Sequence, residues 1–185
     1  MSLRAERAAG TREQLLDAGL RLAERSGLGA MSVNLIVAEA GVAKGTFFHH
    51  FGDRTAFLLA LHRSFHDRLF DEIGKLVGGI APGRKRLLAM ANGYLDGCLR
   101  HRGVRALLLE MRAEPVIAAE IATRNEQVSR LISPDFAALG WSHPRDGAAL
   151  WNGLVVEAAL LEYAAGRRRS ATRNALAQFL PHPAA

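Results

Sequence analysis

The segment of residues 32–51 most constrains the fold of this chain, because it has the pattern of two short helices joined by a tight turn at Gly41. Ser32 is a residue type that caps helix N-termini, and Gly41 can adopt the positive φ that ends a helix and reverses the chain. Apolar residues recur at helical spacing on both sides of the turn: they are Val33, Ile36, Val37, Ala40, Val42, Phe47 and Phe51. The segment is therefore predicted to be a helix-turn-helix packed around a small core.

The second predicted helix carries small, cationic and hydrogen-bonding side chains, which suit the major groove of DNA, about 12 Å wide. Lys44 and His49 can donate to base edges or phosphates, and Thr46 can bond a phosphate or contact a thymine methyl group. Phe47 is expected in the core, whereas Phe48 and His50 either lie beside the sugar-phosphate backbone or wedge the next helix in place. The predicted DNA-binding residues are Ser32, Asn34, Ala43, Lys44, Thr46, Phe48, His49 and Arg54.

The same segment carries a family resemblance. Residues 36–42 read IVAEAGV, residues 45–51 read GTFFHHF, and Arg54 follows. Residues 11 to about 59 thereby resemble the N-terminal DNA-binding domain of TetR-type bacterial transcriptional regulators. Val37 departs from the family pattern, where Ala is usual, and so does Phe48, where a Tyr hydroxyl often reaches a phosphate. The resemblance implies an all-α fold with a three-helix DNA-binding head, and a C-terminal helical bundle that binds ligand and dimerises.

The charge of the chain gives this interpretation little support, because the basic residues are not concentrated in the predicted DNA-binding segment. The formal net charge is +6, yet residues 1–54 hold seven Lys and Arg against six Asp and Glu. A nonspecific architectural DNA-binding protein, the alternative within the nucleic-acid class, would be expected to carry a more basic surface. The helix-turn-helix pattern therefore carries the functional prediction.

The composition also favours a cytoplasmic protein. Cys98 is the single cysteine, which excludes an intramolecular disulfide and fits a reducing compartment. No apolar run approaches the roughly 20 residues that span a bilayer, and the N-terminus lacks the apolar core of a signal peptide. We therefore expect no membrane partner.

Helical periodicity continues through the rest of the chain, with no alternating segment that indicates a strand. Thr11 and Gln14 form a capping box, so residues 1–10 are expected to be either a disordered terminus or an arm that approaches DNA. Beyond the helix-turn-helix, helices are predicted at residues 11–25, 54–77, 84–101, 104–114, 115–132, 145–165 and 171–179, with a break at residues 133–134. The expected domains are residues 1–54 and 78–185, linked by the helix of residues 54–77.

Residues 145–165 are apolar around most of the predicted helix, so this helix must bury more than one face. A second subunit is the simplest cover, and the family resemblance implies a homodimer through residues 145–165 and 171–179. Two recognition helices would then read a palindromic operator with half-sites about 34 Å apart, or a multiple of it. A central buried helix in a monomer is the alternative.

A regulatory pocket is predicted in the C-terminal half, where large adaptable apolar residues are interspersed with a few polar ones. A small-molecule effector, of unknown identity, would release the operator by binding better to a conformer with wrongly spaced heads. The same residue types also build ordinary cores. The candidate pocket residues are Met90, Tyr94, Cys98, Met111, Trp151, Asn152 and Val155.

Other chemistries have weaker signals. His62 and His66 have the spacing of a metal-ligand pair, but without a second pair they favour a surface role. Cys98 and His101 lack a third residue to orient them as nucleophile and base, so a small helical enzyme remains only an alternative. We expect no cofactor, no metal and no catalytic residues. The basic run of residues 167–169 is expected to be a solvated turn.

Overall fold

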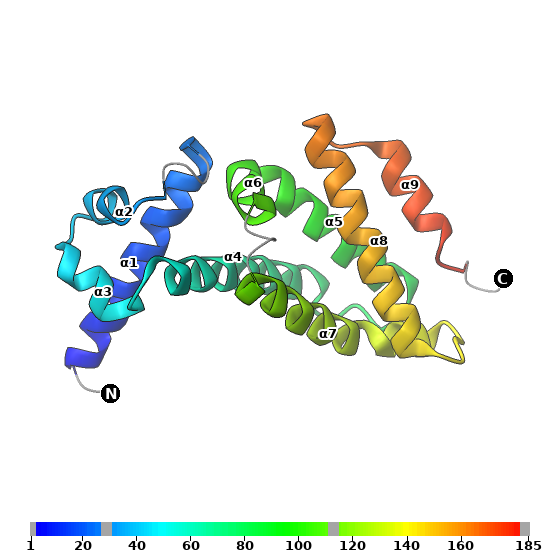
Figure 1. Ribbon diagram of the computed structural model, residues 1–185. Coiled ribbons are helices and arrows are strands. Elements are labelled where there is room, and N and C mark those ends of the chain that lie inside the picture. The colour runs from blue at the N-terminus through cyan, green and yellow to red at the C-terminus, as the bar shows by residue number, and fades with distance from the viewer. Residues whose placement is uncertain (1–2, 27–30, 111–114, 182–185) are drawn as a thin grey trace. The chain divides into compact units, whose positions relative to one another are not determined.

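The structure, a computed structural model, describes residues 3–26, 31–110 and 115–181, and within these ranges every regular element is a helix, as predicted. Figure 1 shows their order along the chain. The helices are α1 (Leu3–Ser26), α2 (Val33–Ala40), α3 (Lys44–Phe51), α4 (Arg54–Val77), α5 (Arg84–Arg100), α6 (Arg102–Glu110), α7 (Pro115–Ala138), α8 (Pro144–Ala165) and α9 (Ser170–Gln178).

The chain packs as two compact units, and α4 contributes to both. The first comprises Met1–Asp67 and His101–Ala118, and the second comprises Arg68–Arg100 and Ala119–Ala185. Helix α6 thus belongs to the first unit, although α5, which directly precedes it, belongs to the second. The functional division at residues 54 and 78 stays a prediction.

The first unit is built around apolar side chains of α1, α2, α3 and the first half of α4. Burying large apolar side chains of this kind contributes roughly 1.5–3 kcal/mol each. The largest fully buried ones in this unit are Leu15, Leu16, Met31, Ile36, Phe47, Phe57 and Leu61.

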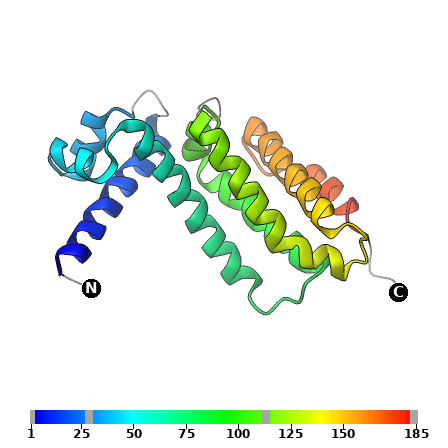
Figure 2. The ribbon, with the colours of Figure 1, turned by 60° about the horizontal axis from the view of Figure 1, so that its bottom comes forward.

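The second unit has its own core, formed by one face each of α5, α7, α8 and α9. Figure 2 shows α8 and α9 lying side by side, and the two helices are in contact. The most buried members of this core are Leu87, Leu95, Phe136, Ala148, Ala159 and Leu180.

The structure corrects two helix boundaries. α1 begins at Leu3, so residues 3–10 are helical and are neither an arm nor disordered. Thr11 therefore lies inside the helix, where its hydroxyl donates to the Arg7 carbonyl oxygen at 3.0 Å, and it is not a cap. Ala, Arg and Glu dominate residues 3–10, and their high helix propensity explains the extension.

The second correction concerns α7, which passes through Pro134 to end at Ala138 and does not break at residues 133–134. Proline interrupts a helix because it lacks the backbone N–H donor and crowds the preceding turn. Here Ile132 and Phe136 on either side of it are buried in the core of the second unit. Their packing outweighs the local cost.

Helix α6 approaches α1 unusually closely at Gly103. A Cβ atom at Gly103 would lie 2.3 Å from the Glu24 Cα and 2.5 Å from the Ala23 carbonyl oxygen, both of which are backbone atoms. Glu24 also ties the two helices together, since its Oε2 accepts from the Gly103 N–H at 3.0 Å and its Oε1 lies 3.5 Å from His101 Nδ1. Glycine is therefore required at this contact.

We expect Gly103→Ala to lower the free energy of unfolding by about 1–3 kcal/mol, because the added methyl group meets backbone that cannot move aside without displacing α6. Urea unfolding followed by circular dichroism measures this loss. Gly10→Ala is the matched control, because a Cβ there meets nothing within 4 Å and alanine favours the helix by up to about 1 kcal/mol. Equal stability of Gly103→Ala and the wild type would contradict the close approach.

Candidate DNA-binding surface and effector cavity

The turn between α2 and α3 has the predicted local chemistry. Ser32 is the N-cap of α2, with its Oγ accepting from the Leu35 N–H at 3.3 Å. Gly41 has φ 67° and ψ 32°, the left-handed conformation that glycine adopts without steric cost, and its N–H donates to the Ala38 carbonyl oxygen at 3.2 Å. These caps set the direction in which α3 leaves the turn.

The inner face of α3 is held by aromatic packing. Phe47 is fully buried, and its ring lies 5.2 Å from that of Phe57 on α4 and 5.5 Å from that of Phe51. Phe51 in turn packs edge to face on Phe57 at 5.0 Å. Aromatic pairs at these separations contribute beyond their buried area. Phe47 is thus a core residue, as predicted, and this anchoring leaves the opposite face of α3 to solvent.

That opposite face carries most of the predicted DNA-binding residues. Lys44 and His49 are exposed, Phe48 is 44% exposed, and Thr46 is partly buried. Ala43 is exposed as the N-cap of α3. Ser32 and Asn34 are exposed at the first turn of α2, where helix N-terminal amides also attract phosphate.

Arg54 has a second role that the sequence did not indicate. Its Nε donates to the Met31 carbonyl oxygen at 2.7 Å, which joins the start of α4 to the segment just before α2. Asp53 caps α4 as predicted, since its Oδ1 accepts from the Ala56 N–H at 2.7 Å. Arg54 therefore has a structural role in addition to its predicted contact with DNA.

Arg12 on α1 adds a cation beside α3 that sequence spacing could not reveal. Its guanidinium lies 5.2 Å from the centre of the Phe51 ring, a cation–π contact. Burial, together with the charges of His49 and Arg12, holds the pKa of His50 below its ordinary value. The imidazole rings of His49 and His50 are 5.2 Å apart. This end of α3 is therefore rich in groups that can donate to an anionic backbone.

The candidate pocket residues lie at two different depths in the second unit. Cys98, Trp151 and Val155 are buried in its core, and Tyr94 packs against that core. Asn152 Nδ2 donates to Asn125 Oδ1 at 3.1 Å. Met111 lies outside the described residues.

Met90 lines a cavity of about 300 Å³ between α4, α5 and α7. The volume is at the lower end of the range for small-molecule sites. The polar side chains of its lining are Arg86, Arg124 and Gln127, and the rest of the lining is apolar apart from the backbone at Gly74. All of these residues belong to the second unit.

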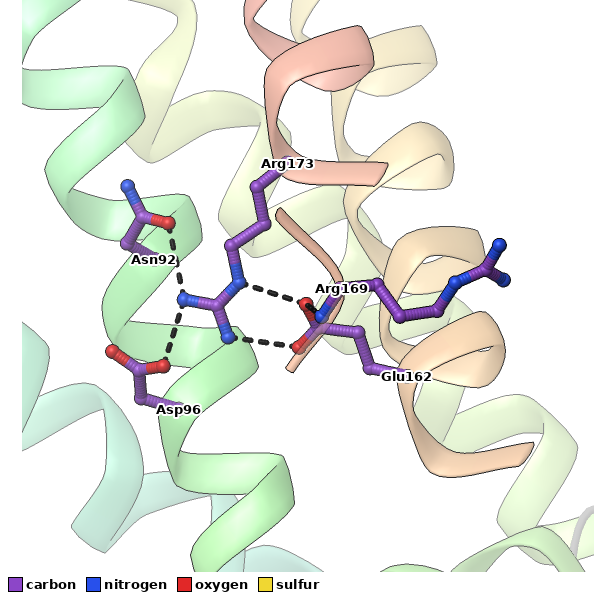
Figure 3. A network of polar contacts seen from close by, with 5 residues as sticks. All are labelled: Asn92, Asp96, Glu162, Arg169 and Arg173. Carbon is purple, nitrogen blue, oxygen red and sulfur yellow. Dashed lines mark hydrogen bonds and ion pairs between the residues drawn. The ribbon is translucent and has the colours of Figure 1, made fainter. Parts of the chain in front are cut away.

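A buried ion-pair network joins α5, α8 and α9 in the same unit, and Figure 3 shows its side chains converging on Arg173. Arg173 donates to both carboxylate oxygens of Glu162, each at 2.8 Å. Its Nη1 lies 2.7 Å from Asp96 Oδ1 and 3.2 Å from Asn92 Oδ1. Glu162 also accepts from the Arg169 backbone N–H at 2.9 Å, immediately before α9 begins. The network fastens α9 to its two neighbours.

The remaining candidates divide between the interior and the surface. The surface role expected for His62 and His66 is wrong, because both side chains are buried. Among the described residues no group of three His, Cys, Asp or Glu side chains could hold a metal ion. Arg167 and Arg168 are exposed in the turn between α8 and α9, as predicted. In the described part of the chain no helix is long and apolar enough to cross a bilayer.

Comparison with known proteins agrees with this geometry. The family described as bacterial regulatory proteins, tetR family, matches residues 15–61. The chain is 29% identical to the HTH-type transcriptional regulator BetI of Cronobacter sakazakii, over 92% of this chain and 93% of that protein. It is 31% identical to the HTH-type transcriptional repressor NemR of Escherichia coli K12, over 48% of this chain and 50% of that protein.

The fold also has counterparts among solved structures. A transcriptional regulator from Rhodococcus sp. Rha1 superposes with a TM-score of 0.77, covering 91% of this chain and 92% of that one. The two sequences are 24% identical, so this likeness shows the fold alone.

Proposed function

We propose a mechanism for this chain, which belongs to the TetR family of bacterial regulatory proteins and is a DNA-binding transcriptional regulator. In this mechanism a homodimer represses transcription by placing the α3 helix of each subunit in the major groove of a palindromic operator. A small molecule bound in the second unit then releases the operator. The protein acts in the cytoplasm, where bacterial DNA is read.

The single observation that carries the proposal is the two-sided character of α3. One face is anchored by Phe47 and Phe51, and the other presents Lys44 and His49 to solvent. Anchoring fixes the direction of the exposed donors, which base readout requires. Contacts from Ser32 and Asn34 at the start of α2 would set the register on the phosphate backbone.

Dimerisation through α8 and α9 is supported by apolar side chains that the subunit leaves uncovered. Trp151 and Val155 bury one face of α8 in the core, yet Leu150 is 69% exposed and Leu161 is 40% exposed on the same helix. Phe179, just after α9, is 60% exposed. A second copy would cover this surface by a two-fold interface that uses the same patch on both subunits.

We expect Leu150→Glu combined with Leu161→Glu to shift the dimer to monomers, because the interface would have to bury four carboxylates without partners. Analytical ultracentrifugation measures the change in sedimentation. Leu76→Glu, which alters a similarly exposed leucine on α4, is the control and should leave the dimer intact. An unchanged dimer in the double variant would place the interface elsewhere.

Effector binding would reach the DNA-binding surface through α4, which takes part in both units, and through the connection from α5 to α6. α4 runs without a break from one unit into the other, as Figure 1 shows, and α5 leads directly into α6, which packs on α1. The protein has one conformer that binds the operator and one that does not. An effector can change operator affinity only to the extent that it binds these two conformers with different affinities. The cavity between α4, α5 and α7 is placed to create such a difference, because one of its walls is α4 itself.

Selection of bound duplexes from a random pool with the full chain tests the proposed function. We expect a palindromic sequence that binds at least about 10³-fold more tightly than scrambled duplexes at physiological salt. Equal affinity for scrambled duplexes would instead support a nonspecific architectural protein. If the protein retained no duplex at all, the DNA-binding interpretation would be wrong.

A further inference from the structure

We propose that the cavity between α4, α5 and α7 selects effectors that have an apolar body and a carboxylate group. The inference rests on the proposed function, in that it identifies the chemical class of the effector. It follows from two features of the cavity: an apolar wall with room for a ligand, and two guanidinium groups whose own carboxylate partners do not line the cavity.

The apolar wall comes from all three helices. Its side chains are Phe70, Ile73, Val77, Met90, Val128 and Leu131. Gly74 on α4 enlarges the space, because a Cβ atom there would meet nothing within 4 Å. A ligand body without polar groups would replace water against this surface.

Arg86 is fixed at the cavity by a fully buried acid. Asp135 is 0% exposed, and its carboxylate accepts from Nε of Arg86 at 2.7 Å and also from Nη2. Asp135 accepts in addition from the Gly83 N–H at 2.8 Å, so it is held from two sides. The hydrogen bonds and the charge of Asp135 raise the pKa of Arg86. Its third nitrogen, Nη1, makes no hydrogen bond within the described part of the chain, so it remains available to a ligand.

Arg124 is oriented by an aromatic ring. Its guanidinium lies 5.9 Å from the centre of the Phe70 ring, and Phe70 belongs to the apolar wall. Arg124 Nη2 lies 3.8 Å from Oε1 of Glu120, one turn earlier on α7. Among the described residues, both arginines line the cavity and neither carboxylate does. The lining therefore presents donors and positive charge.

Guanidinium groups recognise carboxylates with hydrogen bonds that are charge-assisted and roughly twice as strong as neutral ones. A cationic ligand would meet two like charges in a partly enclosed space and would be repelled by them. A neutral ligand would keep only the apolar contacts and weaker hydrogen bonds. Selectivity for a carboxylate thus distinguishes this cavity from a merely apolar one.

Calorimetric titration of the full chain with three probes that share one body tests the inference. The probes are 4-phenylbutyrate, 4-phenylbutyramide and 4-phenylbutylamine. We expect the carboxylate to bind at least about tenfold more tightly than the amide, and the amine to bind most weakly. Equal affinities, tightest binding by the amine, or no binding by the carboxylate would overturn the inference.

Two variants locate the binding. Arg124→Met keeps the apolar contacts and should bring the affinities for carboxylate and amide close together, whereas Arg130→Met should preserve the preference. Arg130 is the matched control, because it lies on the same helix but pairs with Glu126 at the surface. Gly74→Leu should fill the cavity and abolish binding of all three probes without unfolding α4. Wild-type binding of 4-phenylbutyrate to Gly74→Leu would place the ligand elsewhere and overturn the inference.

Operator affinity measured with and without 4-phenylbutyrate separates this inference from the proposed function. If the protein prefers the carboxylate and this preference depends on Arg124, the ligand class is supported. If 4-phenylbutyrate then leaves operator affinity unchanged, the proposed regulation is wrong. Intact operator binding with no carboxylate preference overturns the ligand class alone. Calorimetry needs no DNA, so failure of the DNA-binding proposal leaves this test valid.

Discussion

Replacing Lys44 and His49 together with alanine is expected to lower operator affinity by at least about 30-fold, because each specific contact to a base or phosphate contributes roughly 1–3 kcal/mol. Both side chains are exposed on α3 and lie opposite its buried aromatic anchor. Their removal should therefore leave the free energy of unfolding nearly unchanged. Fluorescence anisotropy with a labelled operator measures the loss of affinity, and thermal unfolding checks the fold.

The salt dependence of the same binding separates two kinds of contact. If Lys44 contacts a phosphate, Lys44→Ala should reduce the slope of log affinity against log salt by about one per subunit. A purely base-reading side chain would leave the slope unchanged and relax the preference at one position of the operator. Lys75→Ala with His143→Ala is the matched control, since these residues are also exposed but lie outside α3. If the Lys44 and His49 double variant bound the operator as tightly as the wild type, α3 would not be part of the DNA interface.

Replacing Arg173 with methionine is expected to cost about 3–5 kcal/mol of stability, because it leaves the carboxylate of Glu162 buried without its cation. Glu162 is 1% exposed, and Figure 3 shows its carboxylate facing the guanidinium of Arg173. The loss should appear as a lower midpoint of thermal and urea unfolding. Arg130→Met, which breaks an exposed pair, should cost less than about 1 kcal/mol. Similar losses in the two variants would show that burial of the Arg173 pair has no energetic consequence.

The pH dependence of that loss gives a second readout with a defined sign. Burial tends to raise the pKa of Glu162, but hydrogen bonds from Arg173 and from the Arg169 N–H outweigh it and hold the pKa below its ordinary value of 4.5. The wild type should therefore keep this stabilisation above about pH 4.5 and lose it as the pH falls through the lower folded-state pKa. In Arg173→Met burial dominates and raises that pKa. The stability difference between the two proteins should consequently shrink in acid.

The parts of the fold that depend on local chemistry could be predicted from the sequence. The helix predicted at residues 54–77 is α4, because Asp53 caps its start and two glycines follow its end. The reversal at Gly41 and the inward position of Phe47 likewise follow from residue type and helical spacing. The DNA-facing side of α3 could be inferred as the complement of its apolar side.

The features that sequence reasoning missed depend on contacts between distant segments. Arg12 reaches Phe51 only because α1 lies beside α3 in the folded unit, and no spacing encodes that contact. The cavity shares only Met90 with the described candidate residues, because the other large apolar side chains pack into the closed core. Whether a side chain fills a core or lines a space is decided by the packing of several helices.

The bond from Arg54 to the Met31 carbonyl has a consequence for mutagenesis of the DNA-binding surface. It ties the first turn of α4 to the entry of α2, so an axial displacement of α4 would carry Ser32 and Asn34 with it. Replacing Arg54 by alanine removes a positive charge and a mechanical support in one step. Lysine in its place would retain the charge but lack the Nε donor, so the two substitutions together separate electrostatic attraction from geometric alignment.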